Sequence, residues 1–391
     1  MEKSGDLKFD DFYKPTSNFF KVVGIDFDNE KPKSIKAKIK RNLITIYGYY
    51  GVFCLIMFST NRAIQLPMII VQGFEEIIKA MFSIIPLPVS AYQAIFFMTN
   101  KKEINKIVDM LKELFPKTQK DQEKYQIKIY HKSLVKFVKF YIAITSVLMF
   151  VFSLSTISKM IEDGIKVNED TWLPEFLDRR NPYVFAVFSS CLFWITLGCV
   201  IPQIASNLII GLFVSNLKIQ FEILKVDIKA ALNDPNLTLK EFKVLIVQHN
   251  KLIDISNRLR KLFSMILLLE FIQSSLVISC TTAQLLFMKG VDFIAFIVNF
   301  LFSFIHYYFP YYYGQLLYDS SQIVLHAIEE SNWYNIKNNE VKKALILMTQ
   351  SSRNAKYLTG SEFVIIYRPT YRKVLMTSYS FISLLLQLYE K

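Results

Sequence analysis

Apolar runs long enough to cross a lipid bilayer alternate along this chain with segments rich in lysine and arginine. A helix needs about 20 apolar residues to span the roughly 30 Å hydrocarbon core of a bilayer. Seven stretches reach or approach that length, so we predict an all-α, polytopic membrane protein with seven transmembrane helices. The predicted spans are residues 43–61, 68–98, 137–157, 183–214, 262–288, 291–318 and 362–389.

The second predicted span is the least regular of the seven. Glu75, Glu76 and Lys79 lie near its start, and charged side chains are costly inside a bilayer. Pro86 and Pro88 are expected to bend it, because proline cannot donate the helical hydrogen bond.

The basic residues between the spans predict an orientation. Four segments, beginning with the amino-terminal one, carry 10, 10, 9 and 8 lysines and arginines, whereas the three that alternate with them carry 1, 4 and 1. Because basic segments stay in the cytosol, the amino terminus is predicted to be cytosolic and the carboxyl terminus extracellular. G-protein-coupled receptors have the opposite orientation.

These assignments divide the chain into regions. Residues 101–136 and 215–261 are expected to be cytosolic helical extensions of the spans, and Asn233, Asp234 and Pro235 should break the second into a helical hairpin. The predicted regions are a cytosolic amino-terminal segment at 1–42, helices one to six at 43–318, a cytosolic segment at 319–361, and the last helix with an extracellular carboxyl terminus at 362–391.

Composition agrees with a membrane protein and argues against other classes. Hydrophobic residues make up 52% of the chain and the mean hydropathy is +0.28. The net charge of +13 does not indicate a nucleic-acid partner, because the basic residues lie in the segments between apolar runs. The first 42 residues are polar, so we expect no cleavable signal peptide. All four cysteines lie inside apolar runs, and we expect no structural disulfide.

No motif for enzyme chemistry is visible. The four histidines are far apart, and none forms a metal-ligand spacing with cysteine or acidic residues. We also find no nucleophile elbow, phosphate-binding loop or dinucleotide fingerprint. The chain is therefore predicted not to be an enzyme, with no catalytic residue, metal or cofactor.

A carboxylate lies within the fifth predicted span. Glu270 and Gln273 are surrounded there by leucine and isoleucine, and a carboxylate at this depth normally faces protein or water rather than lipid. Two interpretations are open: a role in helix packing or at a cavity, and a proton or ion site.

The last predicted span has one face that changes from polar to apolar. Such a stripe is typical of a pore wall with a hydrophobic gate, although serine and threonine also serve as helix-packing contacts. The residues of this face are Thr377, Ser380, Leu384, Gln387 and Leu388.

The run from Val374 to Phe381 and the following Leu386, Gln387 and Leu388 resemble the closing motif of insect odorant receptors. Thr359, Gly360 and Phe363, the length of the chain and the inverted seven-span topology extend the resemblance. Its motif is specific only over about the last thirty residues.

This resemblance implies a subunit of a ligand-gated, non-selective cation channel in the plasma membrane of a sensory neuron dendrite. It implies a heteromeric tetramer with the odorant receptor co-receptor, in which cytosolic helices anchor the subunits and the seventh helices line the pore. The gate would fall on Leu384 and Leu388, with Gln387 between them. The co-receptor's long cytosolic insertion is missing here, so the chain resembles a ligand-tuning subunit.

The resemblance further implies that a small volatile molecule binds in the outer half of the helix bundle. Pocket candidates were chosen by depth and helix alone. They are Phe82, Met149, Phe150, Ser153, Phe188, Leu192, Tyr307 and Tyr308. The alternatives are a gustatory receptor channel, a G-protein-coupled receptor and a transporter, although we find no internal repeat of the kind that transporters show.

Overall fold

A computed structural model gives the architecture of most of the chain. The described residues are 9, 11, 35–73, 77–78, 80–81, 84–162, 178, 180–284 and 291–389.

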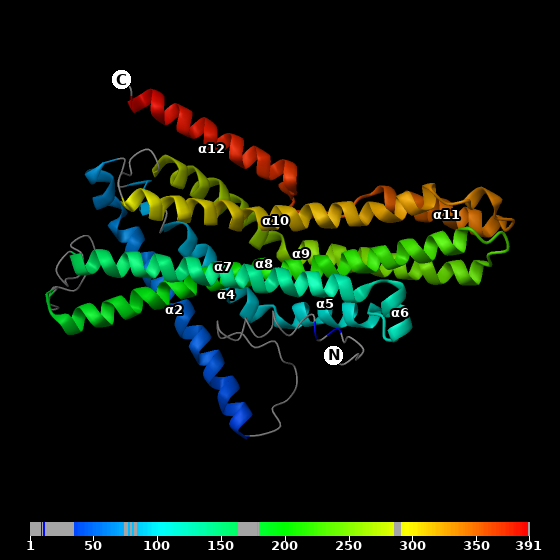
Figure 1. Cartoon of the computed structure of the whole chain (residues 1–391), viewed down its shortest axis with the longest axis horizontal. Helices are drawn as coiled ribbons and strands as arrows, with labels where there is room; N and C mark the ends of the chain where they lie inside the picture. Colours follow the sequence, from blue (N-terminus) through cyan, green and yellow to red (C-terminus); the bar gives the residue numbers. More distant parts are fainter. Residues whose placement is uncertain are drawn as a thin grey trace.

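Long helices dominate the molecule, and α8, α9 and α10 run alongside one another through its centre (Figure 1). The amino-terminal half contains α2 (Ile35–Gln72), α4 (Pro86–Thr99), α5 (Lys101–Leu114), α6 (Gln119–Lys124) and α7 (Ile127–Glu162). The remainder contains α8 (Pro182–Leu232), α9 (Leu239–Gln284), α10 (Val291–Glu329), the 3-10 turn η1 (Trp333–Asn335), α11 (Asn339–Arg353), β1 (Leu358–Gly360), β2 (Val364–Ile366) and α12 (Arg368–Tyr389).

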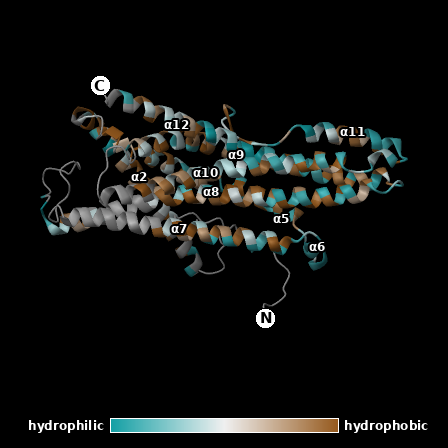
Figure 2. Ribbon diagram, turned by 45° about the horizontal axis from the view of Figure 1, so that its top comes forward, coloured by the Kyte–Doolittle hydropathy of each residue, from teal (hydrophilic) through white to brown (hydrophobic). Residues whose placement is uncertain are grey.

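The helices are those of a polytopic membrane protein. Three in the described part of the chain are long and apolar enough to cross a bilayer: Gly48–Val71, Gly198–Leu232 and Leu239–Gln284. Hydrophilic residues gather at the end of the bundle that carries α6 and α11 (Figure 2). This distribution agrees with a membrane-embedded half and a polar half, while the number of seven spans stays a prediction.

The predicted helical hairpin after the fourth span is confirmed. Helix α8 ends at Leu232, and α9 begins seven positions later, at Leu239. At this second start, Thr238 Oγ1 accepts from the backbone N–H of Glu241 (3.4 Å), while Glu241 Oε2 accepts from the backbone N–H of Thr238 (3.1 Å). This reciprocal cap satisfies two amides that the first turn of a helix leaves free, so the turn is specified locally.

The second predicted span, residues 68–98, is wrong as a single helix. Helix α2 continues through Gln72, and the chain turns at Gly73, whose φ of +116° is readily accessible only to glycine. Pro86 occupies the first turn of α4, where no helical amide is lost, so it begins a helix instead of bending one. The expected helical extension of this span is also interrupted, because α4 ends at Thr99 and α5 starts anew after Asn100.

The last helix begins at Arg368 rather than at residue 362, because a two-stranded antiparallel hairpin occupies residues 358–366. Leu358 pairs with Ile366, and Ser361 and Glu362 adopt positive φ of 48° and 65° in the turn. Two glycines let this hairpin approach its neighbours closely. A Cβ on Gly360 would lie 3.0 Å from the Cα of Leu268 on α9, and a Cβ on Gly314 of α10 would overlap the carbonyl oxygen of Ile366.

Candidate functional site

Helix α12 leans against α9 and α10 along one side and leaves its other side uncovered (Figure 1). Tyr371, Val374 and Ser378, which are three or four residues apart, form the buried side. The predicted pore residues lie on or beside the uncovered side: Thr377, Ser380, Leu384 and Gln387 are exposed in the single chain. The side chain of Leu388, the second predicted gate residue, lies outside the described residues.

The hydroxyls on the uncovered side of α12 are satisfied within their own helix. Thr377 Oγ1 donates to the carbonyl oxygen of Lys373 and Ser380 Oγ donates to that of Met376, each at 3.0 Å. A hydroxyl bonded in this way keeps lone pairs that can accept from water or a hydrated ion. This face can therefore border water or a neighbouring subunit without leaving a donor unpaired.

Tyr371 joins the root of α12 to α10. Its ring contacts those of Phe304, Tyr308 and Tyr311, with centroid distances of 5.7, 5.4 and 5.0 Å. Its hydroxyl donates to the backbone carbonyl oxygen of Phe304 at 2.7 Å. Aromatic packing and a directed hydrogen bond together hold the two helices in one arrangement at this contact, which we call the Tyr371 joint.

A second contact, midway along α12, joins it to α9. Ser279 Oγ donates to Ser378 Oγ at 3.0 Å, and the Ser378 hydroxyl donates in turn to the carbonyl oxygen of Val374. Small hydroxyl side chains let two helix backbones approach while a hydrogen bond crosses the interface. The candidate pore helix is thus coupled to both of the helices it packs against.

Glu270 lies at the centre of the bundle, where polar side chains of several helices meet. Its Oε1 accepts from Gln93 Nε2 of α4 (2.8 Å) and from Ser206 Oγ of α8 (3.0 Å). Its Oε2 is buried and has no hydrogen-bond partner among the described residues. These neutral contacts support the helix-packing interpretation of Glu270, while its role as a proton or ion site stays an untested alternative.

Gln273, one turn further along α9, extends this network to α8 and α10. Its Nε2 donates to Gln203 Oε1 (3.2 Å) and to the hydroxyl of Tyr307 (2.7 Å), and Gln203 Nε2 donates to Ser90 Oγ (2.7 Å). Buried polar groups of this kind specify one arrangement of helices, because any other arrangement would leave them unpaired. Four helices, α4, α8, α9 and α10, are therefore held together through side chains at one level of the bundle.

A third polar contact lies between α7, α8 and α10. The hydroxyl of Tyr141 lies 2.7 Å from His306 Nδ1 and accepts from Asn207 Nδ2 at 3.3 Å. Phe309 packs edge-on against the Tyr141 ring, with the centroids 4.6 Å apart. Helix α7 is thereby connected to the same central helices.

The two described pocket candidates are neighbours in sequence but have different surroundings. Tyr307 is buried and accepts a hydrogen bond from Gln273, whereas Tyr308 packs against Tyr312 and Tyr371 at the Tyr371 joint. Phe82 and the side chains of Met149, Phe150, Ser153, Phe188 and Leu192 lie outside the described residues. Tyr307 thus belongs to the polar network around Gln273, whereas Tyr308 belongs to the contact with α12. The rest of the proposed pocket stays a prediction.

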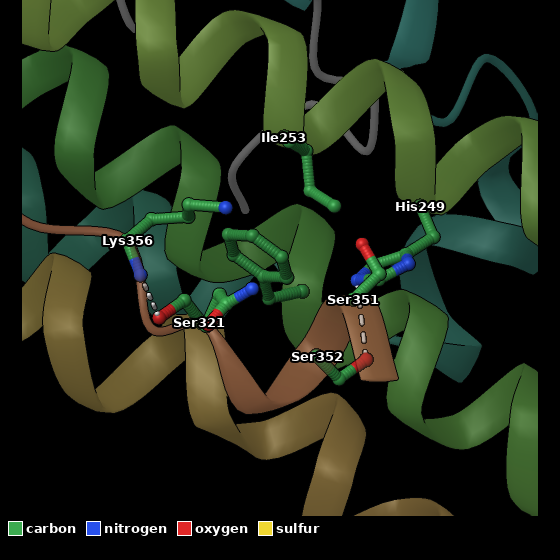
Figure 3. Close-up of a pocket in the computed structure, with 8 residues that line it drawn as sticks. His249, Ile253, Ser321, Ser351, Ser352 and Lys356 are labelled. Atoms are coloured by element: carbon green, nitrogen blue, oxygen red, sulfur yellow. Dashed lines mark hydrogen bonds between the residues drawn. The ribbon is translucent and has the colours of Figure 1, made fainter. Parts of the chain in front are cut away.

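The described part of the chain has hollows at the amino-terminal end of α12 and in the polar half of the molecule. One is a groove of about 450 Å³ at the root of α12, bordered by Phe271, Phe363, Thr370 and Thr377 among others. The other is a cleft between α8, α9, α10 and the end of α11, where Lys356, His249 and Ser352 lie close together (Figure 3). Its walls lie too close together to admit a water molecule, so it is a packing contact between the helices.

His249 is a buried histidine in this polar half of the molecule. Its Nε2 lies 3.4 Å from Ser352 Oγ. Burial, aided by the charge of Lys356, lowers the pKa of His249 from 6.5 to about 4. The imidazole is therefore neutral at physiological pH and serves packing between α9 and α11.

Nothing in the described residues indicates a metal centre: no group of three histidine, cysteine or acidic side chains could hold an ion there. Cys54, Cys199 and Cys280 are free thiols, and the side chain of Cys191 lies outside the described residues.

The sequence analysis did not identify several polar residues of the network around Glu270 and Gln273. Gln93, Gln203 and Ser206 lie inside apolar runs, and a polar residue at such a position is a signal for interhelical contact that could have identified them. The contact of Tyr371 with α10 was not predicted either, because Tyr371 lies among the basic residues Arg368, Arg372 and Lys373, where no apolar pattern indicates a buried side chain.

Comparison with known proteins gives this arrangement its context. A protein-family model described as "7tm Odorant receptor" matches residues 73–379. Odorant receptor 85c of Drosophila melanogaster is 24% identical over 391 residues, covering 97% of this chain and 100% of that protein. Odorant receptor 85b of the same species is 25% identical over 343 residues, covering 81% and 84%.

Solved structures share the fold at much lower identity. The insect olfactory receptor OR5 from Machilis hrabei superposes with a TM-score of 0.82 at 12% identity, covering 96% of this chain and 98% of that one. The structure of the same receptor in complex with eugenol superposes with a TM-score of 0.79 at 13% identity, covering 97% and 98%.

Proposed function

The chain belongs to the insect odorant receptor family, and from this premise we propose that it is the odorant-tuning subunit of a ligand-gated cation channel. In this proposal a small volatile molecule binds among the helices of the outer half of the bundle. Its binding favours an open arrangement of α12, which lines the pore together with the same helix of the co-receptor. The assembly is a heteromeric tetramer in the plasma membrane of a sensory neuron dendrite.

The observation that carries this proposal is the two-sided character of α12. One side is fastened to α9 and α10 through Ser378 and Tyr371, while the other exposes Thr377, Ser380 and Leu384. A helix that only packed inside its own bundle would not leave hydroxyls and a leucine uncovered at successive turns. A helix that borders a water-filled pore needs both groups: hydroxyls where ions pass, and an apolar ring where water can be expelled.

The ligand is proposed to be weakly polar. The related receptor OR5 from Machilis hrabei has been solved in complex with eugenol, which supports a small aromatic or similarly apolar molecule for this chain. Such a ligand opens the channel only if it binds the open bundle more tightly than the closed one, since equal affinity shifts no population. The Tyr371 joint supplies a physical connection from α10 to α12 through which that preference could act.

The deciding experiment records odorant-evoked currents in cells that express the chain with and without the co-receptor, while G-protein signalling is blocked. We expect currents only when both are present, and unchanged by the block. A requirement for G proteins would indicate a G-protein-coupled receptor instead. Currents from the chain alone would rule out the dependence on the co-receptor.

Gate variants test the part assigned to α12. Leu384→Ser should raise the current without odorant several-fold, because a hydroxyl in the apolar ring favours water in the closed pore. Leu384→Ile keeps the apolar character and should leave the resting current low. An equal resting current in both variants would place the gate elsewhere.

A further inference from the structure

Helix α7 begins with a row of exposed lysines on its outer face. Lys128, Lys132, Lys136 and Lys139 follow one another at intervals of four, four and three residues, which places them on one face of the helix. All four side chains are exposed. We refer to these four residues as the lysine row.

The lysine row has no acidic counterpart in the described part of the chain, where none of its four ammonium groups makes an ion pair or hydrogen bond. The preceding Lys124 differs, because its Nζ lies 3.0 Å from Asp227 Oδ1 of α8. The row therefore presents uncompensated positive charge, whereas Lys124 fixes the start of α7 against the protein.

The opposite side of α7 is occupied by protein contacts. Val138, Tyr141 and Thr145 are buried against α8 and α10, and Tyr130, which lies on this packing side, is near Glu222 of α8. Figures 1 and 2 both place α7 across the bundle from α12, the helix proposed to line the pore. In a channel assembled around α12, the lysine row lies on the outer side of the channel, away from its central axis.

The lysine row meets the membrane boundary. The predicted third span begins at residue 137, and the outer face of α7 continues from lysines into apolar side chains: Phe140 and Val147 are 64% and 61% exposed. From Lys128 to Lys139 the helix rises roughly 16 Å, whereas the headgroup layer of one leaflet is only about 5 to 7 Å thick. The upper lysines therefore lie within the headgroup layer and the lower ones project beyond it into water.

We infer that the lysine row binds the headgroup of an anionic membrane lipid that carries several phosphates, such as a phosphoinositide. A headgroup with one charge at the bilayer surface reaches only the upper lysines. A polyphosphorylated headgroup extends from the surface and can contact the lower ones as well, and clusters of basic residues beside a span are the usual binding site for such lipids. The inference rests on the orientation predicted from the basic segments, which puts the start of α7 in the cytosol.

Binding can be measured on the full chain in nanodiscs. One set contains phosphatidylcholine with 5 mol% phosphatidylinositol 4,5-bisphosphate, and another replaces this lipid by phosphatidylserine at matched net charge. The readout is the affinity for a fluorescent phosphatidylinositol 4,5-bisphosphate tracer. We expect the polyphosphorylated lipid to displace the tracer, phosphatidylserine to do so at least tenfold less well, and inorganic phosphate or a phosphopeptide to do so hardly at all.

Variants locate the site. The double variant Lys132→Gln, Lys136→Gln should weaken binding roughly thirtyfold, since each lysine near an anionic surface contributes about fivefold. The control is Lys240→Gln, Lys243→Gln at the start of α9, which removes the same charge from exposed lysines about 30 Å of helix away from the nearest predicted span. If the double variant fails to fold, Lys132→Gln alone should lose about fivefold.

Each outcome decides the question. Equal weakening by the α9 control would show nonspecific charge attraction and overturn the site. Equal binding of phosphatidylserine, or effective competition by inorganic phosphate or a phosphopeptide, would overturn the lipid assignment. The measurement needs no odorant, so lipid binding by a chain that passes no odorant-evoked current would refute the proposed function and leave this site standing.

Discussion

The hydroxyl of Tyr371 on α12 donates to the backbone carbonyl oxygen of Phe304 on α10 at 2.7 Å, inside a cluster of aromatic rings. Tyr371→Phe keeps the ring and removes only this bond. We expect a loss of about 0.5 to 1.5 kcal/mol in the free energy of unfolding. If the joint transmits opening, the odorant concentration for half-maximal current should shift with little change in surface expression.

Tyr308→Phe is the matched control for the Tyr371 joint. The Tyr308 ring packs against Tyr371, but its hydroxyl makes no hydrogen bond within the described residues. Thermal unfolding of the purified chain and odorant dose–response curves report on the two effects separately. Identical behaviour of the two variants would show that the hydrogen bond to Phe304 carries no coupling.

Gly314 on α10 gives a second prediction, because a side chain there would overlap the backbone of β2. Gly314→Ala should cost about 1 to 3 kcal/mol of stability and displace the hairpin that precedes α12. Gly51→Ala is the control, since a Cβ on Gly51 meets nothing within 4 Å and replaces glycine by a better helix former. Thermal unfolding should therefore move in opposite directions, and a harmless Gly314→Ala would contradict the close approach.

Two substitutions at Glu270 distinguish a helix-packing role from a proton or ion site. Glu270→Gln retains an oxygen that can accept from Gln93 and Ser206, which are the only hydrogen bonds that Glu270 Oε1 makes to side chains among the described residues. Glu270→Leu removes the acceptor and leaves two buried donors unpaired, at about 1 to 3 kcal/mol each. We expect near-native thermal stability for glutamine and a large loss for leucine. Equal losses would show that the carboxylate itself is needed and would favour a proton or ion site.

The sequence predicted the parts of this fold that depend on local signals. The α8–α9 hairpin follows from Asn233 to Pro235 and from the cap at Thr238, all of which act within a few residues. The β-hairpin could not be predicted in the same way, because strands of three residues are too short for periodicity to detect. It depends on Gly314, more than forty residues earlier, whose missing side chain makes room for it.

In the candidate site, too, contacts within one helix were predictable from sequence and contacts between helices were not. Helical spacing within one helix predicted that Thr377, Ser380 and Leu384 lie together, and the structure leaves all three exposed. The contact of Gln93 with Glu270 joins residues 177 positions apart, so no local sequence pattern predicts that these two side chains meet. Interhelical contacts of this kind follow from the packing of the whole bundle, where unpaired polar groups are costly.

His249 predicts a dependence of stability on acid. Its pKa is about 4 in the folded protein and 6.5 when unfolded, so the unfolded chain binds the additional proton as the pH falls between these values. Stability should be fully present above pH 6.5 and decrease by up to about 3 kcal/mol toward pH 4. The loss should be smaller in His249→Gln, which removes the buried imidazole. Thermal unfolding from pH 7.5 to 5 measures the difference, and equal slopes for the native protein and His249→Gln would contradict a buried neutral His249.

Asn236 offers a test of orientation that is independent of currents. It begins the sequence Asn236-Leu237-Thr238, a glycosylation acceptor, and it is exposed in the turn between α8 and α9. Burial therefore cannot protect it, and only a cytosolic location would leave it unmodified. We expect no change in electrophoretic mobility after glycosidase treatment of the native chain. A chain extended at its carboxyl terminus by a spacer and an acceptor sequence should shift, because that end is predicted to be extracellular. Modification of Asn236 would reverse the orientation, and the lysine row of α7 would then face a leaflet that lacks phosphoinositides.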